Sequence, residues 1–141
     1  MMILLRTVLT ALVLSILSLV PAAWAQEKIS VQDAFAMAEA GDVTLVDIRT
    51  PREWKQTGVA SLAETINVYD EAFLGDLMTL LEGDPTKPVA FICAVGGRSG
   101  QLSSILTERG FTRVFDVTEG MKGSGAGPGW IKAGLPVVDY K

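Results

Sequence analysis

The chain has no histidine and only one cysteine among its 141 residues. A zinc site built from cysteine and histidine is therefore excluded, and so is any catalytic pair in which histidine activates serine or cysteine. An internal disulfide is excluded as well, because it would need a second cysteine. Any chemistry of the single thiol has to proceed without an imidazole base.

Basic residues are also few. Lys+Arg number 12 against 16 Asp+Glu, which gives a net charge of -4. Nucleic-acid binding needs a clustered basic surface, and the sequence contains no cluster of this kind. We therefore expect no nucleic-acid partner. No group of residues implies a metal or an organic cofactor.

Long apolar runs are confined to the N-terminal segment, in residues 8–20. Arg6 precedes this run, and Ala23 and Ala25 form the small-residue pattern of a cleavage site. We interpret residues 1–25 as a secretory signal peptide, followed by one domain over residues 26–141 that acts in the periplasm or outside the cell. The alternative is an uncleaved membrane anchor, which would be the only membrane contact. The run is shorter than the roughly 20 apolar residues that a spanning helix needs.

The remaining chain alternates between strand patterns and helix patterns. Ser30 and Asp33 predict the start of a helix that Gly41 ends, and Thr50 with Glu53 forms a capping box. This alternation indicates an α/β domain with a central parallel sheet, helices on both faces and ligand sites at the carboxyl ends of the strands. The expected strands cover residues 43–46, 65–68, 88–92 and 112–117, and the expected helices residues 31–40, 51–56, 70–81 and 99–109.

The cysteine, Cys93, lies between the expected central strand and the helix that opens near Ser99. Gly96 and Gly97 allow the backbone between them to curl, so that successive N–H groups point at the sulfur. The positive end of the helix dipole and the cation Arg98 act in the same direction. We therefore expect a reactive thiolate that needs no histidine.

Residues 93–98, a cysteine and an arginine separated by four residues, resemble the active-site loop of the rhodanese domain. Further stretches are similar to motifs of the same family, in the same order along the chain. The similarity covers roughly residues 29–138. These stretches are LVDIR at residues 45–49, the pair Glu53-Trp54, INV at residues 66–68 and GLP at residues 134–136.

The resemblance implies a rhodanese-like fold and a sulfurtransferase activity. In this family the cysteine attacks the outer sulfur of a donor such as thiosulfate, holds it as a persulfide and passes it to cyanide or a thiol. Cys93 would be that catalytic residue, with a small sulfur-containing anion and a thiol as partners, and a protein sulfur acceptor as a further candidate. We expect Arg98 to position an anionic donor and to fix the loop. The expected substrate-binding residues are Ala94, Val95, Gly96, Gly97, Arg98 and Ser99.

Three features depart from the family pattern. Ala94 and Val95 carry no basic side chain, whereas thiosulfate-active members often place a cation in the loop, so a less charged donor is favoured. Val59 stands where the family usually has a histidine after its glycine. The glycine-rich stretch at residues 120–130 is longer than expected, and the sequence leaves open whether it is a flexible connector or a flap anchored by Trp130.

Several polar and aromatic residues are expected to act structurally. Asp47 and Arg49 follow a strand and precede a capped helix, so we expect them to hydrogen-bond loop backbone and to support the site. Ser99 is expected to cap or line the helix start, and a contact with substrate stays open. Trp54 and Trp130 are interpreted as core or loop anchors.

Other functions remain as alternatives. A rhodanese-like module could relay sulfur within a periplasmic pathway, or bind a partner, with little activity on free thiosulfate. A phosphatase of related fold would need five residues between cysteine and arginine, one more than residues 93–98 provide. Generic thiol–disulfide exchange is disfavoured because no second cysteine can resolve a mixed disulfide.

Overall fold

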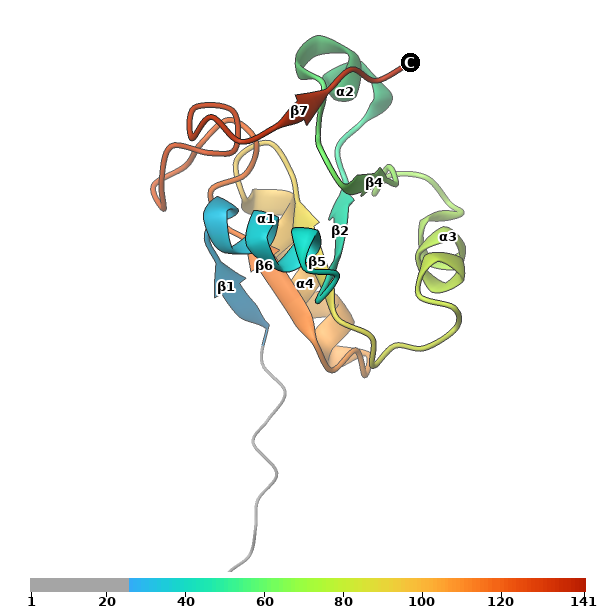
Figure 1. Ribbon diagram of the computed structural model, residues 1–141. Coiled ribbons are helices and arrows are strands. Elements are labelled where there is room, and N and C mark those ends of the chain that lie inside the picture. The colour runs from blue at the N-terminus through green and yellow to red at the C-terminus, as the bar shows by residue number, and fades with distance from the viewer. Residues whose placement is uncertain (1–25) are drawn as a thin grey trace, which may run out of the picture.

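The computed structural model describes residues 26–141, so the predicted signal peptide lies outside the described residues. A five-stranded sheet with the order β1-β6-β5-β2-β4 forms the centre of the molecule (Figure 1), and every neighbouring pair of strands in it is parallel. The prediction of a central parallel sheet is confirmed. Its strands are β1 (Glu27–Ile29), β2 (Thr44–Asp47), β4 (Ala63–Thr65), β5 (Val89–Ile92) and β6 (Val114–Val117).

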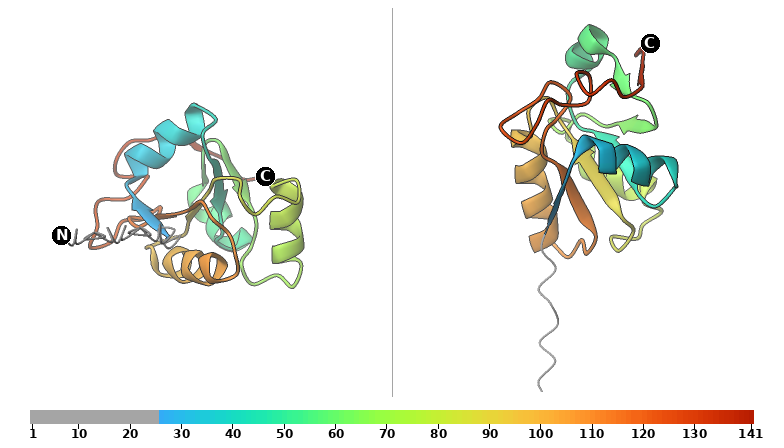
Figure 2. Two further views of the ribbon diagram at one scale, coloured as in Figure 1. Left: turned by 90° about the horizontal axis from the view of Figure 1, so that it is seen from below. Right: turned by 60° about the vertical axis from the view of Figure 1, so that its left-hand side comes forward.

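Helices cover both faces of this sheet, as predicted (Figure 2). On one face, α1 (Val31–Glu39) packs its buried side chains against alternate residues of the strands. On the other face, α3 (Phe73–Leu80) and α4 (Gly97–Glu108) contribute to a second apolar cluster. Leu45 belongs to the first cluster and Val46 to the second, as strand alternation requires. None of the helices within residues 26–141 has the length and apolar character needed to cross a membrane.

The two capped helices begin where the sequence predicts. The Ser30 hydroxyl accepts a hydrogen bond from the Asp33 N–H at 3.0 Å, and this cap opens α1. Helix α2 (Pro51–Thr57) opens with a reciprocal pair of bonds. The Glu53 carboxylate accepts from the Thr50 N–H at 3.0 Å, and the Thr50 hydroxyl accepts from the Glu53 N–H at 3.4 Å.

The strand predicted at residues 65–68 is wrong in position, because β4 ends at Thr65. The chain beyond it still follows β2, since the Ile66 N–H donates to the Asp47 carbonyl at 3.1 Å. The helix predicted from residue 70 begins at Phe73 instead. Residues 67–70 form a turn in which the Asn67 side chain donates to the Asp70 carboxylate at 3.0 Å, and this local bond replaces the first helical turn.

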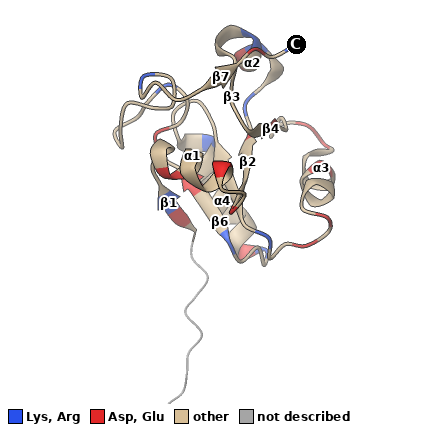
Figure 3. Cartoon of the chain, in the orientation of Figure 1, with Lys and Arg blue, Asp and Glu red and all other residues tan. Residues whose placement is uncertain are grey.

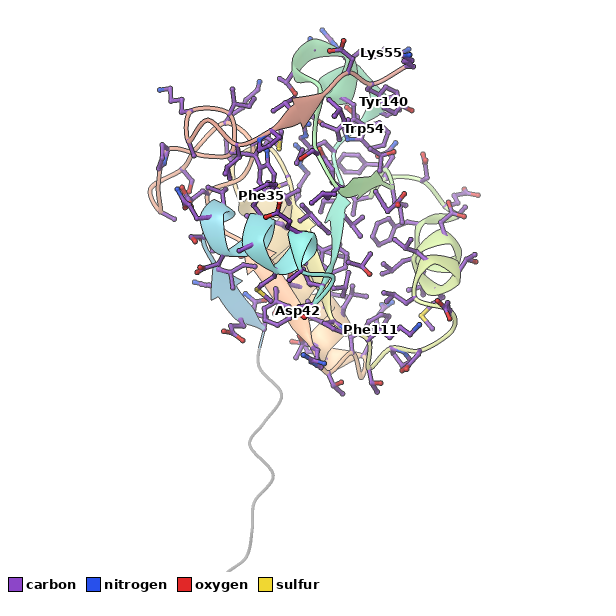
Figure 4. All side chains as sticks on the ribbon, in the orientation of Figure 1. Phe35, Asp42, Trp54, Lys55, Phe111 and Tyr140 are labelled. Atoms are coloured by element: carbon purple, nitrogen blue, oxygen red, sulfur yellow. The ribbon has the colours of Figure 1, made fainter. Side chains whose placement is uncertain are left out.

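Three short strands were not predicted: β1, β3 (Val59–Ala60) and β7 (Val137–Val138). The last two form a separate antiparallel pair that brings the C-terminal tail to α2. There the side chains of Trp54 and Tyr140 lie next to each other (Figure 4), and their ring centroids are 5.0 Å apart. The two-residue strands carry no pattern that a sequence window could detect, because their pairing depends on residues far apart in the chain.

Candidate active site

Cys93 follows directly after β5, the middle strand of the sheet, and its side chain is 1% exposed. The Sγ atom accepts a hydrogen bond from the Gly96 N–H at 3.2 Å and another from the Ser99 N–H at 3.4 Å. Both donors lie at the start of α4. Backbone N–H groups that converge on one atom stabilise negative charge there, so this arrangement favours a sulfur anion.

Gly96 gives the loop its shape. Its φ of 88° lies in the left-handed region, and a side chain at this position would collide with the carbonyl of Thr118. The left-handed turn leads straight into α4, which explains why the helix begins at Gly97 and not near Ser99 as predicted. Gly97 itself has open space around it and an ordinary φ.

The glycine-rich segment at residues 119–130 supports the cysteine loop from its backbone side. The Met121 N–H donates to the Cys93 carbonyl at 2.8 Å, and the Lys122 N–H donates to the Ala94 carbonyl at 2.9 Å. A side chain at Gly120 would overlap the Ala94 backbone, so the two segments touch closely. Trp130, at the end of the segment, is fully buried.

Trp130 and Glu119 hold this segment in place. The Trp130 indole N–H donates to the Pro136 carbonyl at 2.9 Å, and its ring packs edge-on against Phe35. The buried Glu119 carboxylate accepts from the Val31 N–H at 2.8 Å and from the Gly129 N–H at 3.3 Å. The sequence analysis did not single out Glu119.

Arg98 points to Glu53 of α2. Its guanidinium donates two hydrogen bonds to the Glu53 carboxylate, at 2.6 and 2.9 Å. These bonds lower the pKa of Glu53 to about 2, and the carboxylate in turn raises the pKa of Arg98. The Arg98 charge is thus largely neutralised by a partner that the sequence analysis had assigned to a helix cap and to a family motif, but not to a contact with the cysteine loop. Figure 3 shows the Lys and Arg segments in blue, spread from α2 to the loops at the lower end.

Ser99 links the sulfur to a buried carboxylate. Its hydroxyl donates to the Asp116 carboxylate at 2.7 Å and lies 3.5 Å from the Cys93 Sγ atom, within reach of the thiol proton. Asp116 lies on β6 and is only 2% exposed, and this burial raises its pKa. The sequence analysis missed Asp116. The available signal was an acidic residue inside a strand that is otherwise apolar.

Asp47 and Arg49 form a fully buried ion pair at 2.8 Å, at the carboxyl end of β2. The Arg49 side chain also donates to the Gly58 carbonyl at 2.9 Å and to the Thr57 hydroxyl at 2.8 Å. The pair therefore ties the end of β2 to the end of α2. It lies at the same edge of the sheet as the cysteine loop, because β2 and β5 are parallel neighbours.

The remaining predicted site residues contribute backbone and shape. Val95 is 56% exposed and, like Ala94, brings no charge to the loop. Beside Arg98, a mostly apolar groove of about 170 Å³ lies between α4 and the turn at residues 67–70. Its walls are formed by Val68, Tyr69, Arg98, Gln101, Leu102 and Ile105.

A parallel α/β sheet with a cysteine loop closed by backbone N–H groups at the end of its middle strand defines a rhodanese-type domain. The family model described as the Rhodanese-like domain matches residues 30–125 of this chain. The chain therefore belongs to the rhodanese-like family.

Its relatives include named sulfurtransferases. The chain is 30% identical over 110 residues to the thiosulfate sulfurtransferase GlpE of Actinobacillus pleuropneumoniae serotype 3, covering 78% of this chain and 91% of GlpE. Among solved structures, it is similar to the polysulfide-sulfur transferase of Wolinella succinogenes, with 29% identity, a TM-score of 0.60 and coverage of 82% and 80%. It is also similar to Rv0390 of M. tuberculosis, with 26% identity, a TM-score of 0.62 and coverage of 82% and 99%.

Proposed function

We propose that this protein is a sulfurtransferase in which Cys93 takes a sulfane sulfur from a donor such as thiosulfate and passes it to cyanide or a thiol. The observation that carries this proposal is the pair of N–H groups, from Gly96 and Ser99, that face the Cys93 sulfur at hydrogen-bond distance. They supply electrostatic stabilisation to a sulfur anion in a site that contains no histidine.

In the first step the Cys93 thiolate attacks the outer sulfur of the donor. A bond forms between Sγ and that sulfur, the bond from that sulfur to the rest of the donor breaks, and its electron pair leaves with sulfite when thiosulfate is the donor. In the second step a cyanide or thiolate attacks the terminal persulfide sulfur, and the Cys93 thiolate is released. Both leaving groups are stable anions, so neither step needs a proton on the leaving atom.

The loop favours a donor with little negative charge. Ala94 and Val95 add no cation, and Glu53 binds the guanidinium of Arg98. An organic thiosulfonate or an organic persulfide carries at most one negative charge on its reacting group, and would need the positive clamp less than the dianion thiosulfate does. The groove beside Arg98 offers a place for the part of a donor or acceptor that is not transferred. In this scheme Arg98 mainly fixes the loop, and Asp47 and Arg49 support the same edge.

The same features favour a second candidate, a sulfur relay to or from another protein. An exposed Val95 beside a neutralised arginine is a surface on which a protein donor or acceptor could rest. We also propose that residues 1–25 are a signal peptide and that the domain works in the periplasm or outside the cell. Sequencing the N-terminus of the exported protein tests this, and the expected first residue is Gln26.

Turnover of purified protein tests the enzymatic proposal. Thiocyanate formation from cyanide is measured with thiosulfate and, in parallel, with an organic thiosulfonate, for the wild type and for Cys93→Ser. We expect turnover that Cys93→Ser abolishes and that is faster with the monoanionic thiosulfonate. Equal rates for both proteins would refute a role for Cys93. A freshly reduced wild type that is inactive with both donors would favour the relay function, which the transfer of sulfur to or from a captured partner protein would then test.

A further inference from the structure

Asp116 is a buried carboxylate that the proposed reaction does not use. It lies on β6, next to the middle strand, and is 2% exposed. The α4 backbone leaves room for it, because a side chain at Gly100 would come within 3.2 Å of its Oδ2 atom. A carboxylate in such a place is costly unless it binds a partner or takes up a proton.

A continuous line of hydrogen bonds joins this carboxylate to the nucleophile. The Cys93 thiol lies 3.5 Å from the Ser99 hydroxyl oxygen, and that hydroxyl donates to Asp116 Oδ1 at 2.7 Å. The second acceptor near this hydroxyl, the Gly96 carbonyl, lies farther away, at 3.2 Å. All three side chains of the line are buried, so water does not compete for the proton.

We propose that Asp116 accepts the thiol proton of Cys93, through Ser99, as the sulfur attacks. The Sγ–H bond breaks and its proton moves to Ser99 Oγ, while the Ser99 O–H proton moves to Asp116 Oδ1. The products are a Cys93 thiolate, an unchanged serine and a neutral carboxylic acid, with no change in net charge and no further reactant. Asp116 is a positioning residue in this scheme, because it reaches the sulfur only through Ser99.

The environment of the two ends favours this transfer. Burial disfavours the charged form of Asp116 and so raises its pKa. At the other end, the N–H groups of Gly96 and Ser99 stabilise the charge once it reaches the sulfur. The negative charge thus moves from an atom with one side-chain donor to an atom with two backbone donors.

Few charged groups face this line. Lys28 of β1 is the register partner of Asp116 and opposes the rise of its pKa. Across β5, the register partner of Asp116 is the apolar Phe91. From α4, Arg98 interacts with Cys93 but is bound to Glu53. Lys28 and Arg98 are therefore the cations that bear on the two ends of the line within residues 26–141.

The test measures how fast Cys93 reacts with methyl methanethiosulfonate, a small uncharged reagent, as a function of pH. In the wild type, Asp116 takes up the thiol proton within the site. We therefore expect a rate that changes less than about twofold per pH unit wherever the carboxylate is ionised and the sulfur still carries its proton. Asp116→Asn keeps the size and can still accept the Ser99 hydrogen bond, but it cannot take a proton. The rate of this variant is expected to fall about tenfold for each unit by which the pH is lowered over the same range.

Ser99→Ala breaks the line at its middle and is expected to show the same slope as Asp116→Asn, with no further change in the double variant. Asp42→Asn is the matched control, because this exposed carboxylate precedes β2 at the opposite end of the sheet (Figure 4). A profile of wild-type shape in Asp116→Asn, or the same shape displaced to lower pH, would overturn the proposal. A displacement to lower pH would identify Asp116 as a charge that only repels the thiolate.

A second measurement decides the matter if the reagent cannot enter the site. The carbon NMR resonances of Cys93 Cβ and Asp116 Cγ are followed through a pH titration. Two steps shared by both residues, reduced to one step for Cys93 in Asp116→Asn, support the coupling of the two groups that the proton transfer requires, and one unchanged step for Cys93 refutes it.

This inference rests on the proposed role of Cys93 as the nucleophile, but neither measurement needs sulfur transfer. Loss of turnover with an intact wild-type profile would refute the sulfurtransferase proposal alone. Turnover with an unchanged Asp116→Asn profile would refute the role of Asp116 alone.

Discussion

The carboxyl ends of β2 and β5 lie side by side, and similar residues at these two ends have different functions. Each strand is followed by an arginine that binds a carboxylate: Arg49 binds Asp47, and Arg98 binds Glu53. Both arginines also hold α2, the first through its C-terminal end and the second through Glu53 in its first turn. At this level the two edges look alike.

They differ in where the backbone N–H groups point. After β2, the Arg49 N–H donates to the Asp47 carboxylate at 3.1 Å, so the donor serves the ion pair that ties the strand to α2. After β5, the N–H groups of Gly96 and Ser99 point at a sulfur. An arginine bound to a carboxylate is therefore a feature of both structural and reactive edges. Donors directed at a nucleophile distinguish the reactive one.

The largest effect is expected at the β2 edge, from Arg49→Met. This change leaves the fully buried Asp47 without its partner, and breaking a buried ion pair costs about 3–5 kcal/mol of unfolding free energy. Urea denaturation measures the loss. The double variant Asp47→Leu with Arg49→Met is the control and should recover much of the stability, because it leaves no unpaired charge. A loss below about 1 kcal/mol in the single variant would contradict a structural role for the pair.

At the β5 edge, Gly96→Ala should slow sulfur transfer by about tenfold or more. The substitution forces a side chain into a left-handed conformation and against the Thr118 carbonyl, so the N–H groups should turn away from the sulfur. Gly97→Ala is the matched control, since its position is open and has an ordinary φ. The assay is thiocyanate formation by folded protein. Equal rates for the two variants would separate the glycine conformation from the chemistry.

Glu53→Gln is expected to lower stability by about 1 kcal/mol at neutral pH, a modest value because the ion pair is partly exposed. The pKa of Glu53 is lowered in the folded state from 4.5 to about 2, chiefly by its hydrogen bonds with Arg98. Its stabilisation is therefore fully present above pH 4.5 and is lost as the pH falls through about 2. The difference between the two proteins in urea denaturation should shrink over that range. A difference that stays constant would refute the coupling.

The smallest effect is expected from Val95→Lys, which places a cation in the exposed part of the loop. It should raise kcat/KM for thiosulfate by roughly threefold at low ionic strength, because the donor is an anion, and the gain should fade with added salt. The reaction with methyl methanethiosulfonate is the control and should not gain. An unchanged rate with thiosulfate would mean that the neutral loop does not limit the choice of donor.

Local patterns in the sequence predicted the parts of the fold that depend on neighbours in the chain. Each of these parts is formed by residues that are close together in the chain. They are the caps at Ser30 and Thr50, the buried strand before Cys93 and the spacing from Cys93 to Arg98. Their geometry is fixed by short-range hydrogen bonds and by hydrophobic periodicity, which a single sequence displays.

The partners across the fold could not be predicted in the same way. Arg98 binds Glu53, which lies 45 residues earlier, and Ser99 binds Asp116, which lies 17 residues later. Several carboxylates could have served each donor, and only the packing of α2, α4 and β6 selects one. The pairing of β3 with β7 has the same origin, because neither strand is long enough to show a period of its own.

The most direct test of the account is the intact mass of the domain after treatment with thiosulfate or an organic thiosulfonate and desalting. The wild type is compared with Cys93→Ser and Arg49→Met. We predict that the wild type gains one sulfur atom and that cyanide removes it. Cys93→Ser should gain none, and the folded fraction of Arg49→Met should gain as much as the wild type. A sulfur adduct that persists in Cys93→Ser, or a freshly reduced wild type that gains none from either donor, would contradict the assignment of the reactive edge to Cys93.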